Sequence, residues 1–225
     1  MKVGTKSLLF GVHQIFWHPL VVARAWRFLY GRWPGFYESI AIFFHDWGYW
    51  GCADIDGPEG KQHPHAGTQI AGRWVFRLEW LRLFFKGLGT PRTLDEWRKF
   101  FSLVAVMANQ TAFFTRTLVR YHSRYWAKSD YVAPSKLCWA DKYCIAFDPQ
   151  WFYLLRARLS GEVKEFRRNA VESNHVPAEA TDQDWFRWYA HRATFMAVQH
   201  SLVNEKVSCP TNPGAPRCRK CRCRV

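Results

Sequence analysis

Apolar residues recur every three or four positions through most of the chain, which is the spacing of one face of an α-helix. After Pro64, for example, Ile70, Trp74 and Leu78 mark one such stripe. The alternation of apolar and polar residues that is typical of a half-buried strand never continues for more than a few residues, and no segment repeats another. The pattern therefore predicts an all-α fold.

Glycine and proline divide this pattern into separate helices. Proline suits the first turn of a helix, where its missing N–H removes no hydrogen bond, so His18-Pro19 and His63-Pro64 indicate two helix starts. Residues 1–17 form a short lead, and residues 54–60 form a polar loop that is either a lid or simply solvated. We expect helices over residues 18–30, 37–49, 63–85, 94–125, 135–147, 151–168 and 182–200.

A chain of 225 residues, of which 48% are hydrophobic, can bury one well-packed core and is short for two. From Pro210 onward, proline, glycine, arginine and cysteine replace the apolar periodicity. We therefore expect one helical domain over residues 1–207, followed by a flexible, basic, cysteine-containing tail over residues 208–225.

The formal net charge is +14. Five of these charges belong to Arg217, Arg219, Lys220, Arg222 and Arg224 of the tail, which leaves +9 for residues 1–216. Such a surface attracts nucleotides, nucleic acid or anionic lipid without distinguishing between them. For the tail this predicts only non-specific contact with nucleic acid.

The tail also contains Cys209, Cys218, Cys221 and Cys223. Four thiolates can form a closed tetrahedral zinc site, and the C-x2-C part has a suitable spacing, although the other spacings are irregular. Two interpretations stay open, a structural Zn²⁺ site and a disordered basic tail with incidental thiols. A zinc-folded tail acting as an adaptor for a partner is a further alternative.

The remaining cysteines, Cys52, Cys138 and Cys144, lie singly among aromatic residues and are expected to be reduced core residues. No apolar stretch reaches the roughly 18 residues of a membrane-spanning helix, and the first residues do not resemble a secretory signal. We expect a cytoplasmic protein that does not associate with membranes.

The most informative residues are two histidines and two aspartates. His18 opens one predicted helix, His45 and Asp46 close the next after the apolar run 40–44, and Asp141 lies in a later, mostly apolar helix. Antiparallel packing of these helices can bring all four side chains into one layer. Imidazole and carboxylate together suit a divalent metal, which can activate water and polarise a phosphoryl oxygen through open coordination positions.

Each of these residues has a simpler interpretation. His18 can cap a helix with Pro19, His45 and Asp46 can form a buried hydrogen-bonded pair, and Asp141 can pair with Lys142 at the surface. Burying the Asp141 carboxylate without a partner would be costly, however, and this favours a metal ligand.

Three motifs carry a resemblance to a known family: HPLVVA at residues 18–23, FFHDWG at 43–48 and ADK at 140–142. Together they resemble the H…HD…D pattern of the HD-domain metal-dependent phosphohydrolases, over about residues 12–170. The sequence of residues 122–142 is also similar to that of a group of uncharacterised phage-encoded HD proteins. That likeness implies no settled substrate, and it would place the protein in the cytoplasm of a bacterial host.

The resemblance implies that His18, His45, Asp46 and Asp141 are the primary metal ligands. Members with two metals add histidines between the HD pair and the last aspartate, and His63 or His65 together with His122 occupy such places. We prefer His63 because it starts a helix. Asp46 would then bridge the two ions, which could be Mn²⁺, Mg²⁺, Co²⁺, Fe²⁺ or Zn²⁺.

One departure from the family pattern concerns acid and base chemistry. The HD pair is followed by Trp47-Gly48-Tyr49, without the Lys or Glu that many members have there. The general acid and base therefore stay unassigned. His13, His175, His191 and His200 lack any such context and are expected to be ordinary surface or packing residues.

Cations and aromatic residues near the ligands complete the predicted site. Arg124, Lys128 and Lys142 would offset negative charge on a phosphate, with Asp46 positioning the attacking water. Trp47, Trp50 or Tyr125 could stack on a base; most other tryptophans, such as Trp185 and Trp188, are expected to be packing residues.

The sequence thus predicts metal-dependent hydrolysis of a phosphate ester or anhydride in a nucleotide or nucleotide-like substrate by metal-activated water. The alternatives are a phosphodiesterase that acts on a cyclic or oligonucleotide signal, and a non-catalytic HD scaffold that binds nucleotides or nucleic acid.

Overall fold

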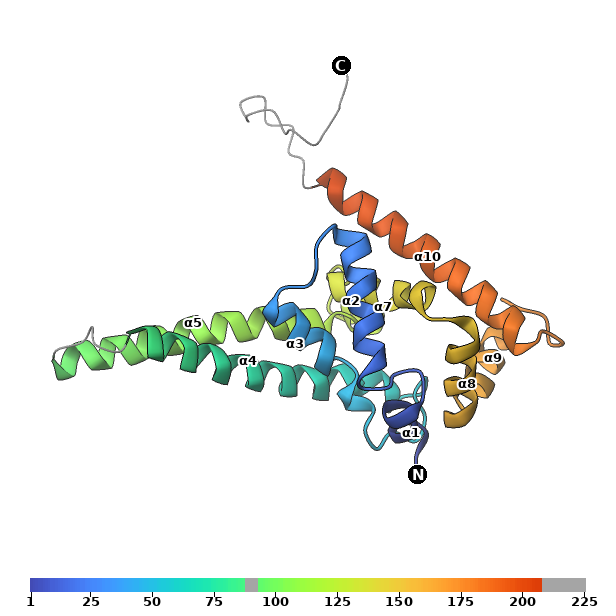
Figure 1. Ribbon diagram of the computed structural model, residues 1–225, viewed down its shortest axis with the longest axis horizontal. Helices are drawn as coiled ribbons and strands as arrows, with labels where there is room; N and C mark the ends of the chain where they lie inside the picture. Colours follow the sequence, from blue (N-terminus) through green and yellow to red (C-terminus); the bar gives the residue numbers. More distant parts are fainter. Residues whose placement is uncertain (88–92, 208–225) are drawn as a thin grey trace, which may run out of the picture.

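The chain forms an all-helical structure (Figure 1). The computed structural model describes residues 1–87 and 93–207, and no strand occurs in that part, which confirms the predicted fold class. The cysteine tail and its possible zinc site lie outside the described residues. Within the described residues, no helix is both long and apolar enough to cross a membrane.

The α-helices are α1 Val3–Phe10, α2 Trp17–Tyr30, α3 Phe36–Phe44, α4 His63–Gly87, α5 Leu94–Arg120, α6 Arg124–Ser129, α7 Lys136–Tyr143, α8 Gln150–Ser160, α9 Glu162–Glu172 and α10 Asp182–Val207. The 3-10 turns are η1 Trp47–Tyr49, η2 Gly60–Gln62 and η3 Cys144–Phe147.

Most predicted helix starts agree with the structure, but several details differ. The lead contains α1, which the pattern missed, and the helix predicted over 37–49 ends at Phe44 before η1. The helix predicted over 151–168 is two helices, because Gly161 has φ of 88° and this left-handed conformation ends α8. The long helix predicted to reach residue 125 ends at Arg120. Just after this end, the carbonyl of Tyr121 accepts a hydrogen bond from the backbone N–H of Ser135. A residue from another segment therefore occupies the acceptor that a further helical turn would use.

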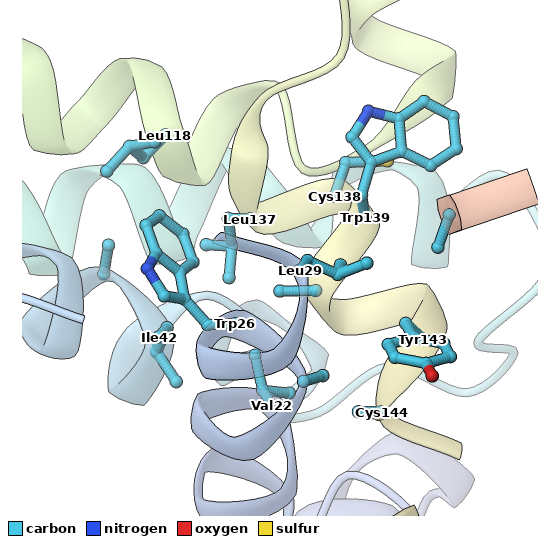
Figure 2. Packing of buried hydrophobic residues seen from close by; sticks show 14 of the residues in the cluster. Val22, Trp26, Leu29, Ile42, Leu118, Leu137, Cys138, Trp139, Tyr143 and Cys144 are labelled. Atoms are coloured by element: carbon cyan, nitrogen blue, oxygen red, sulfur yellow. The ribbon is translucent and has the colours of Figure 1, made fainter. Parts of the chain in front are cut away.

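The main core lies between α2, α3 and α7 (Figure 2). Its largest fully buried side chain is Trp26 of α2, which packs with Val22 and Leu29 of the same helix. Ile42 of α3 and Leu137 of α7 close the cluster from the other helices. This core holds α3 and α7 in fixed positions, and these two helices carry His45, Asp46 and Asp141.

A second core joins α8, α9 and α10, and two buried charged groups tie it to the N-terminal segment. The carboxylate of Glu162, with no exposed surface, accepts hydrogen bonds from Ser7 Oγ at 2.6 Å and from the backbone N–H of Val12 at 3.0 Å. The buried Arg156 guanidinium donates to the carbonyl oxygens of Gly11 and Val12, at 3.3 Å each, and also forms an ion pair with Asp148. Buried charges are tolerated only when paired in this way, so these contacts specify how the second core docks.

Helices α4 and α5 form a long antiparallel pair that extends away from the rest of the molecule (Figure 1). Small buried residues, Ala71 and Gly72 of α4 and Ala108 and Ala112 of α5, let the two helices approach closely. Because the pair is antiparallel, the first turn of α4 and the last turn of α5 lie together at its base. That base is where His63 and His122 are found.

We expect Trp26→Ala to destabilise the protein by about 3–5 kcal/mol, because it leaves a large cavity in the main core. Trp151→Ala is the control: Trp151 is 71% exposed, and its loss should cost within about 0.5 kcal/mol. Chemical denaturation followed by circular dichroism measures both. Equal losses of stability would show that the packing between α2, α3 and α7 is not what stabilises the fold.

Candidate metal centre

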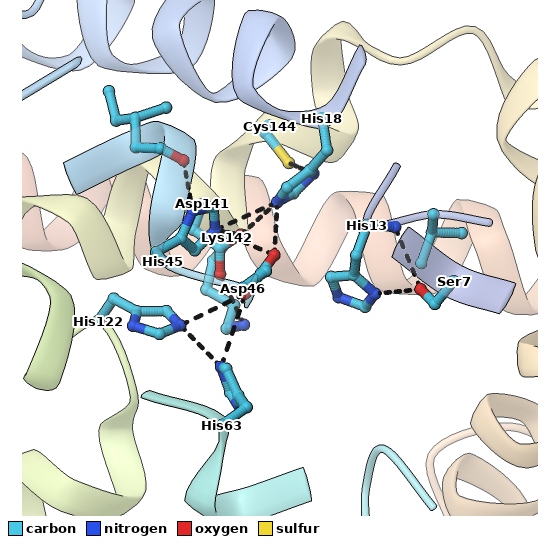
Figure 3. A network of polar contacts seen from close by, with 12 residues as sticks. Ser7, His13, His18, His45, Asp46, His63, His122, Asp141, Lys142 and Cys144 are labelled. Atoms are coloured by element: carbon cyan, nitrogen blue, oxygen red, sulfur yellow. Dashed lines mark hydrogen bonds and ion pairs between the residues drawn. The ribbon is translucent and has the colours of Figure 1, made fainter. Parts of the chain in front are cut away.

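Six side chains from five different helices or helix ends converge in the interior (Figure 3). His18 lies in the first turn of α2, while His45 and Asp46 follow directly after α3. His63 is the first residue of α4, His122 follows the end of α5, and Asp141 lies within α7. These are the six residues predicted as ligands, His18, His45, Asp46, His63, His122 and Asp141.

The first group surrounds one oxygen of Asp46. Oδ2 of Asp46 lies 3.1 Å from Nε2 of His18 and 3.1 Å from Nε2 of His45. Oδ1 of Asp141 lies 3.2 Å from Nε2 of His18 and 3.6 Å from that of His45, and the two Nε2 atoms are 3.3 Å apart. The four atoms therefore form a compact cluster.

The second group surrounds the other oxygen of the same carboxylate. Oδ1 of Asp46 lies 3.6 Å from Nε2 of His63 and 3.6 Å from Nε2 of His122, and these two nitrogens are 2.9 Å apart. One carboxylate thus faces two sets of imidazoles, one with each oxygen. This is the geometry of a carboxylate that bridges two ions.

The spacing of these atoms suits metal coordination. Metal–ligand bonds of about 2.0–2.1 Å put neighbouring ligand atoms about 3.4 Å apart in a tetrahedral site and about 3.0 Å apart in an octahedral one. The contacts between ligand atoms of the two groups, at 2.9–3.6 Å, span this range. The two groups could therefore each hold a divalent ion without rearrangement.

The second nitrogen of three of the imidazoles is bound to the backbone. Nδ1 of His45 lies 2.6 Å from the carbonyl oxygen of Ile42, and Nδ1 of His63 and of His122 each lie 2.5 Å from the carbonyl three residues earlier. A carbonyl can only accept, so Nδ1 carries the proton and donates it. This leaves Nε2 directed at the cluster as a possible ligand, in the arrangement usual for metal-binding histidines.

The electrostatics of the cluster favour a cation. Burial alone would raise the pKa of Asp46, but His45 and His13 hold it well below its usual value. Burial would lower the pKa of His45, whereas Asp46 and Asp141 raise it to about 9. In addition, Oδ2 of Asp46 is buried and accepts no hydrogen bond from the described residues. Such an oxygen is costly unless a positive charge contacts it.

Two glycines allow the ligand-bearing segments to approach one another. A Cβ atom on Gly48 would collide with the backbone of His63, and one on Gly67 would lie 2.6 Å from the carbonyl oxygen of His45. Gly48 lets the backbone of η1 pass directly against the start of α4, and this brings His63 beside Asp46.

A cavity of about 320 Å³ opens over the centre. Arg124, Tyr125 and Lys142 line it, as predicted for residues that would contact a substrate. Lys61 also lines it, and its Nζ lies 5.7 Å from the centre of the Tyr125 ring. The sequence reasoning missed Lys61; its position two residues before the ligand His63 was the available signal.

Four other candidates lie away from this cavity. Lys128 is exposed on α6, Trp50 is 63% exposed, and Trp47 packs against Phe43 and Phe44 of α3; none of the three lines the cavity among the described residues. His65 is exposed as well, whereas His63 is buried in the second group. Of the two histidines that flank Pro64, the structure therefore brings only His63 to the centre.

His13, expected to be an ordinary surface or packing residue, lies beside the centre instead. Its Nδ1 is 3.1 Å from Oε1 of the buried Glu162, and its ring lies 4.8 Å from that of Tyr49. His13 also lines the cavity over the centre. Nothing in the sequence pointed to this contact, because Glu162 is 149 positions away.

Lys142 is held at the centre by its neighbour. Its Nζ lies 3.0 Å from Oδ2 of Asp141, and this carboxylate raises the pKa of the ammonium group well above its usual value. The same side chain lines the cavity over the centre.

Comparisons of the chain with family models, with curated proteins and with solved structures give no match. The geometry of the buried His/Asp cluster is therefore the observation on which a functional proposal rests.

We expect purified protein to bind two Mn²⁺ ions per chain, one in each group. Asp46→Ala should lose both ions, because each group uses one of its oxygens, whereas His122→Ala should retain the ion of the first group. His65→Ala is the control and should keep both. Equilibrium dialysis followed by elemental analysis gives the stoichiometry. The two-ion arrangement is wrong if His122→Ala and His65→Ala bind the same amount.

We expect Gly48→Ala to destabilise the protein by about 1–3 kcal/mol, because the added methyl group overpacks the contact with His63. It should also weaken Mn²⁺ binding in the second group. Gly35→Ala is the control, since its Cβ would meet only Oε2 of Glu38 at 3.4 Å, and its effect should stay under about 1 kcal/mol. Thermal unfolding with and without Mn²⁺ measures both effects; unchanged binding in Gly48→Ala would contradict this role.

Proposed function

We propose that the protein is an HD-type metal-dependent phosphohydrolase that cleaves a phosphate ester or anhydride in a nucleotide or nucleotide-like substrate. The observation that carries the proposal is the shared carboxylate: Asp46 presents Oδ2 to His18 and His45 and Oδ1 to His63 and His122. The three motifs that resemble HD proteins contain His18, His45, Asp46 and Asp141, whereas His63 and His122 lie outside them. The likeness to phage-encoded members and a cytoplasmic location belong to the same proposal.

Divalent ions bound in the two groups would lower the pKa of a coordinated water and polarise a phosphoryl oxygen. Asp46 would hold the ions side by side, and the backbone carbonyls behind His45, His63 and His122 would fix the direction of their imidazoles.

The chain supplies three cations for the phosphate. Lys61, Arg124 and Lys142 line the cavity over the centre, on three separate segments. Guanidinium and ammonium donors form charge-assisted hydrogen bonds with phosphate oxygens, and they would offset the negative charge that develops during hydrolysis. Lys142 is the best placed of them because its neighbour Asp141 belongs to the first group.

His13, which also lines this cavity, would help to orient the substrate. Glu162 engages Nδ1 of His13. The other ring nitrogen is then available for a hydrogen bond with a leaving group or a sugar. This position compensates in part for the missing Lys or Glu after the HD pair.

A non-catalytic scaffold that binds nucleotides or nucleic acid is the second candidate. The net charge of +14 and the Trp47-Gly48-Tyr49 sequence after the HD pair favour it. In that case the ions would serve binding alone, and the protein would release no phosphate.

We expect the protein to release phosphate from nucleoside mono- or triphosphates, or to cleave cyclic or linear oligonucleotides, when Mn²⁺, Mg²⁺ or Co²⁺ is present, and to stop when EDTA is added. Asp46→Ala should reduce kcat/KM by at least about 100-fold because both groups lose a ligand. A malachite-green assay and chromatography of the products measure the two reactions. Binding of Mn²⁺ and nucleotide without turnover of any of these substrates would favour the non-catalytic scaffold.

Two cations of α6 provide an internal comparison. Arg124→Ala should lower kcat/KM by about 10-fold or more, because it removes a charged donor from the cavity. Lys128→Ala, one turn further along the same helix but exposed and away from the cavity, should leave it unchanged. Equal effects of the two substitutions would mean that general surface charge, rather than a contact in the cavity, matters.

A further inference from the structure

A second cavity adjoins the one over the metal centre. It has a volume of about 310 Å³, at the lower end of the roughly 300–1,000 Å³ that is usual for small-molecule sites. Five aromatic residues of α8, α9 and α10 dominate its walls, and we name it the aromatic chamber after them: Tyr153, Phe166, Trp185, Trp188 and Tyr189. Nothing in the proposed chemistry at the metal centre accounts for this chamber.

The aromatic wall of the chamber is rigid. Trp185 is only 3% exposed and stacks between Phe166 and Tyr189, with ring centres 5.5 Å apart on each side and interplanar angles of 17° and 8°. Trp188, one residue before Tyr189, is only half-buried. The chamber thus offers a preorganised aromatic surface. The Trp188 ring lies 5.0 Å from the ring of His175, and the Arg192 guanidinium lies over it at 5.5 Å from its centre.

One side of the chamber is polar. Asn169 of α9 donates from Nδ2 to Oδ2 of Asp56 at 2.7 Å, and the backbone N–H of Asp56 donates to Glu165 at 3.0 Å. These contacts pin the polar loop 54–60 against α9. The Asp56 carboxylate is exposed and can accept further hydrogen bonds, so the chamber combines an aromatic wall with an acceptor-rich edge.

The two cavities share walls. His13, Tyr49, Asp56 and Lys142 line both of them. Lys142 contacts Asp141 of the metal centre and at the same time faces the chamber. A molecule with an anionic group at the centre and a planar group in the chamber would therefore pass beside the Lys142 ammonium.

We infer that the aromatic chamber binds the base of a mononucleotide whose phosphate lies at the metal centre; this rests on the proposed function. A nucleobase has a planar face for Trp188 and a hydrogen-bonding edge for Asp56, and bases stack well on aromatic side chains. The acceptor at Asp56 favours bases with an exocyclic amino group, as in adenine, cytosine and guanine. Because the two cavities share four lining residues, one mononucleotide could occupy both.

The chamber replaces the stacking residues expected from the sequence. Trp47 and Trp50 line neither cavity within the described part of the chain, and Tyr125 belongs to the cavity over the metal centre alone. The sequence predicts Trp188 to be a packing residue, but it lines the chamber because α10 packs against α8 and α9 there. In this proposal it is the residue that stacks on the base.

Trp188→Ala tests the inference, with Trp50→Ala as the matched control because Trp50 is exposed and lies outside the chamber. In the presence of Mn²⁺ we expect Trp188→Ala to raise KM for AMP and CMP by at least about 10-fold, since a stacking contact with the base is lost. Hydrolysis of ribose 5-phosphate, which has the phosphate and sugar but no base, should stay unchanged. Trp188→Phe should recover most of the affinity, and Trp50→Ala should behave as the wild type.

Binding of adenosine and cytidine, measured by calorimetry on the metal-loaded protein, separates this inference from the proposed function. If the wild type hydrolyses no phosphate but binds nucleosides, and Trp188→Ala loses that binding, the chamber is a base site and only the hydrolase proposal fails. Unchanged nucleoside binding in a folded Trp188→Ala, or an equal loss of activity with AMP and ribose 5-phosphate, would overturn the inference. Folding of each variant is checked by circular dichroism.

Discussion

The carboxylate of Asp46 lies buried between two sets of imidazoles, and the rest of the molecule is arranged around the charge that it carries. Moving an ionised carboxylate out of water costs several kcal/mol unless positive charge or hydrogen bonds compensate. Here each oxygen faces two Nε2 atoms, and Oδ2 still accepts no hydrogen bond from any residue that the structure describes. The four histidines that face it come from two helix starts and two helix ends, so the burial of this one carboxylate constrains how most of these helices pack.

The base of the antiparallel α4–α5 pair supplies two of the four imidazoles that face Asp46. Because two antiparallel helices bring the start of one beside the end of the other, His63 and His122 meet without any long-range sequence signal. The contact also needs close backbone approach, which Gly48 and Gly67 allow. Three histidines then donate Nδ1–H to the carbonyl three residues earlier, and this repeated local contact orients all three rings in the same manner.

The part of the chain that follows η3 has a different relation to the centre. Its described residues belong to neither group of the centre, yet α8, α9 and α10 form the aromatic chamber beside it, and Glu162 engages His13 across the junction. Under the proposed function, metal binding and recognition of the base would thus belong to two packed units. Lys142, which contacts Asp141 and lines both cavities, lies where the two meet.

The sequence by itself determined the helical fold class and most helix starts. It also predicted the residues that meet at the centre, with His63 preferred to His65, because most of them are marked by neighbours in the chain: Pro64 after His63, an apolar run before His45, an apolar helix around Asp141. It did not determine where helices stop. At the end of α5 near Arg120, for example, the carbonyl of Tyr121 accepts from the backbone N–H of Ser135, and this contact forms only when the two segments pack together. It also did not show that Trp188, and not Trp50, lines the aromatic chamber. Nor did it show that His13 contacts Glu162, which is 149 positions away. Local signals describe the chain within a few residues. Contacts between distant side chains exist only once the helices have packed, so only the tertiary structure decided the cavities and what lines them.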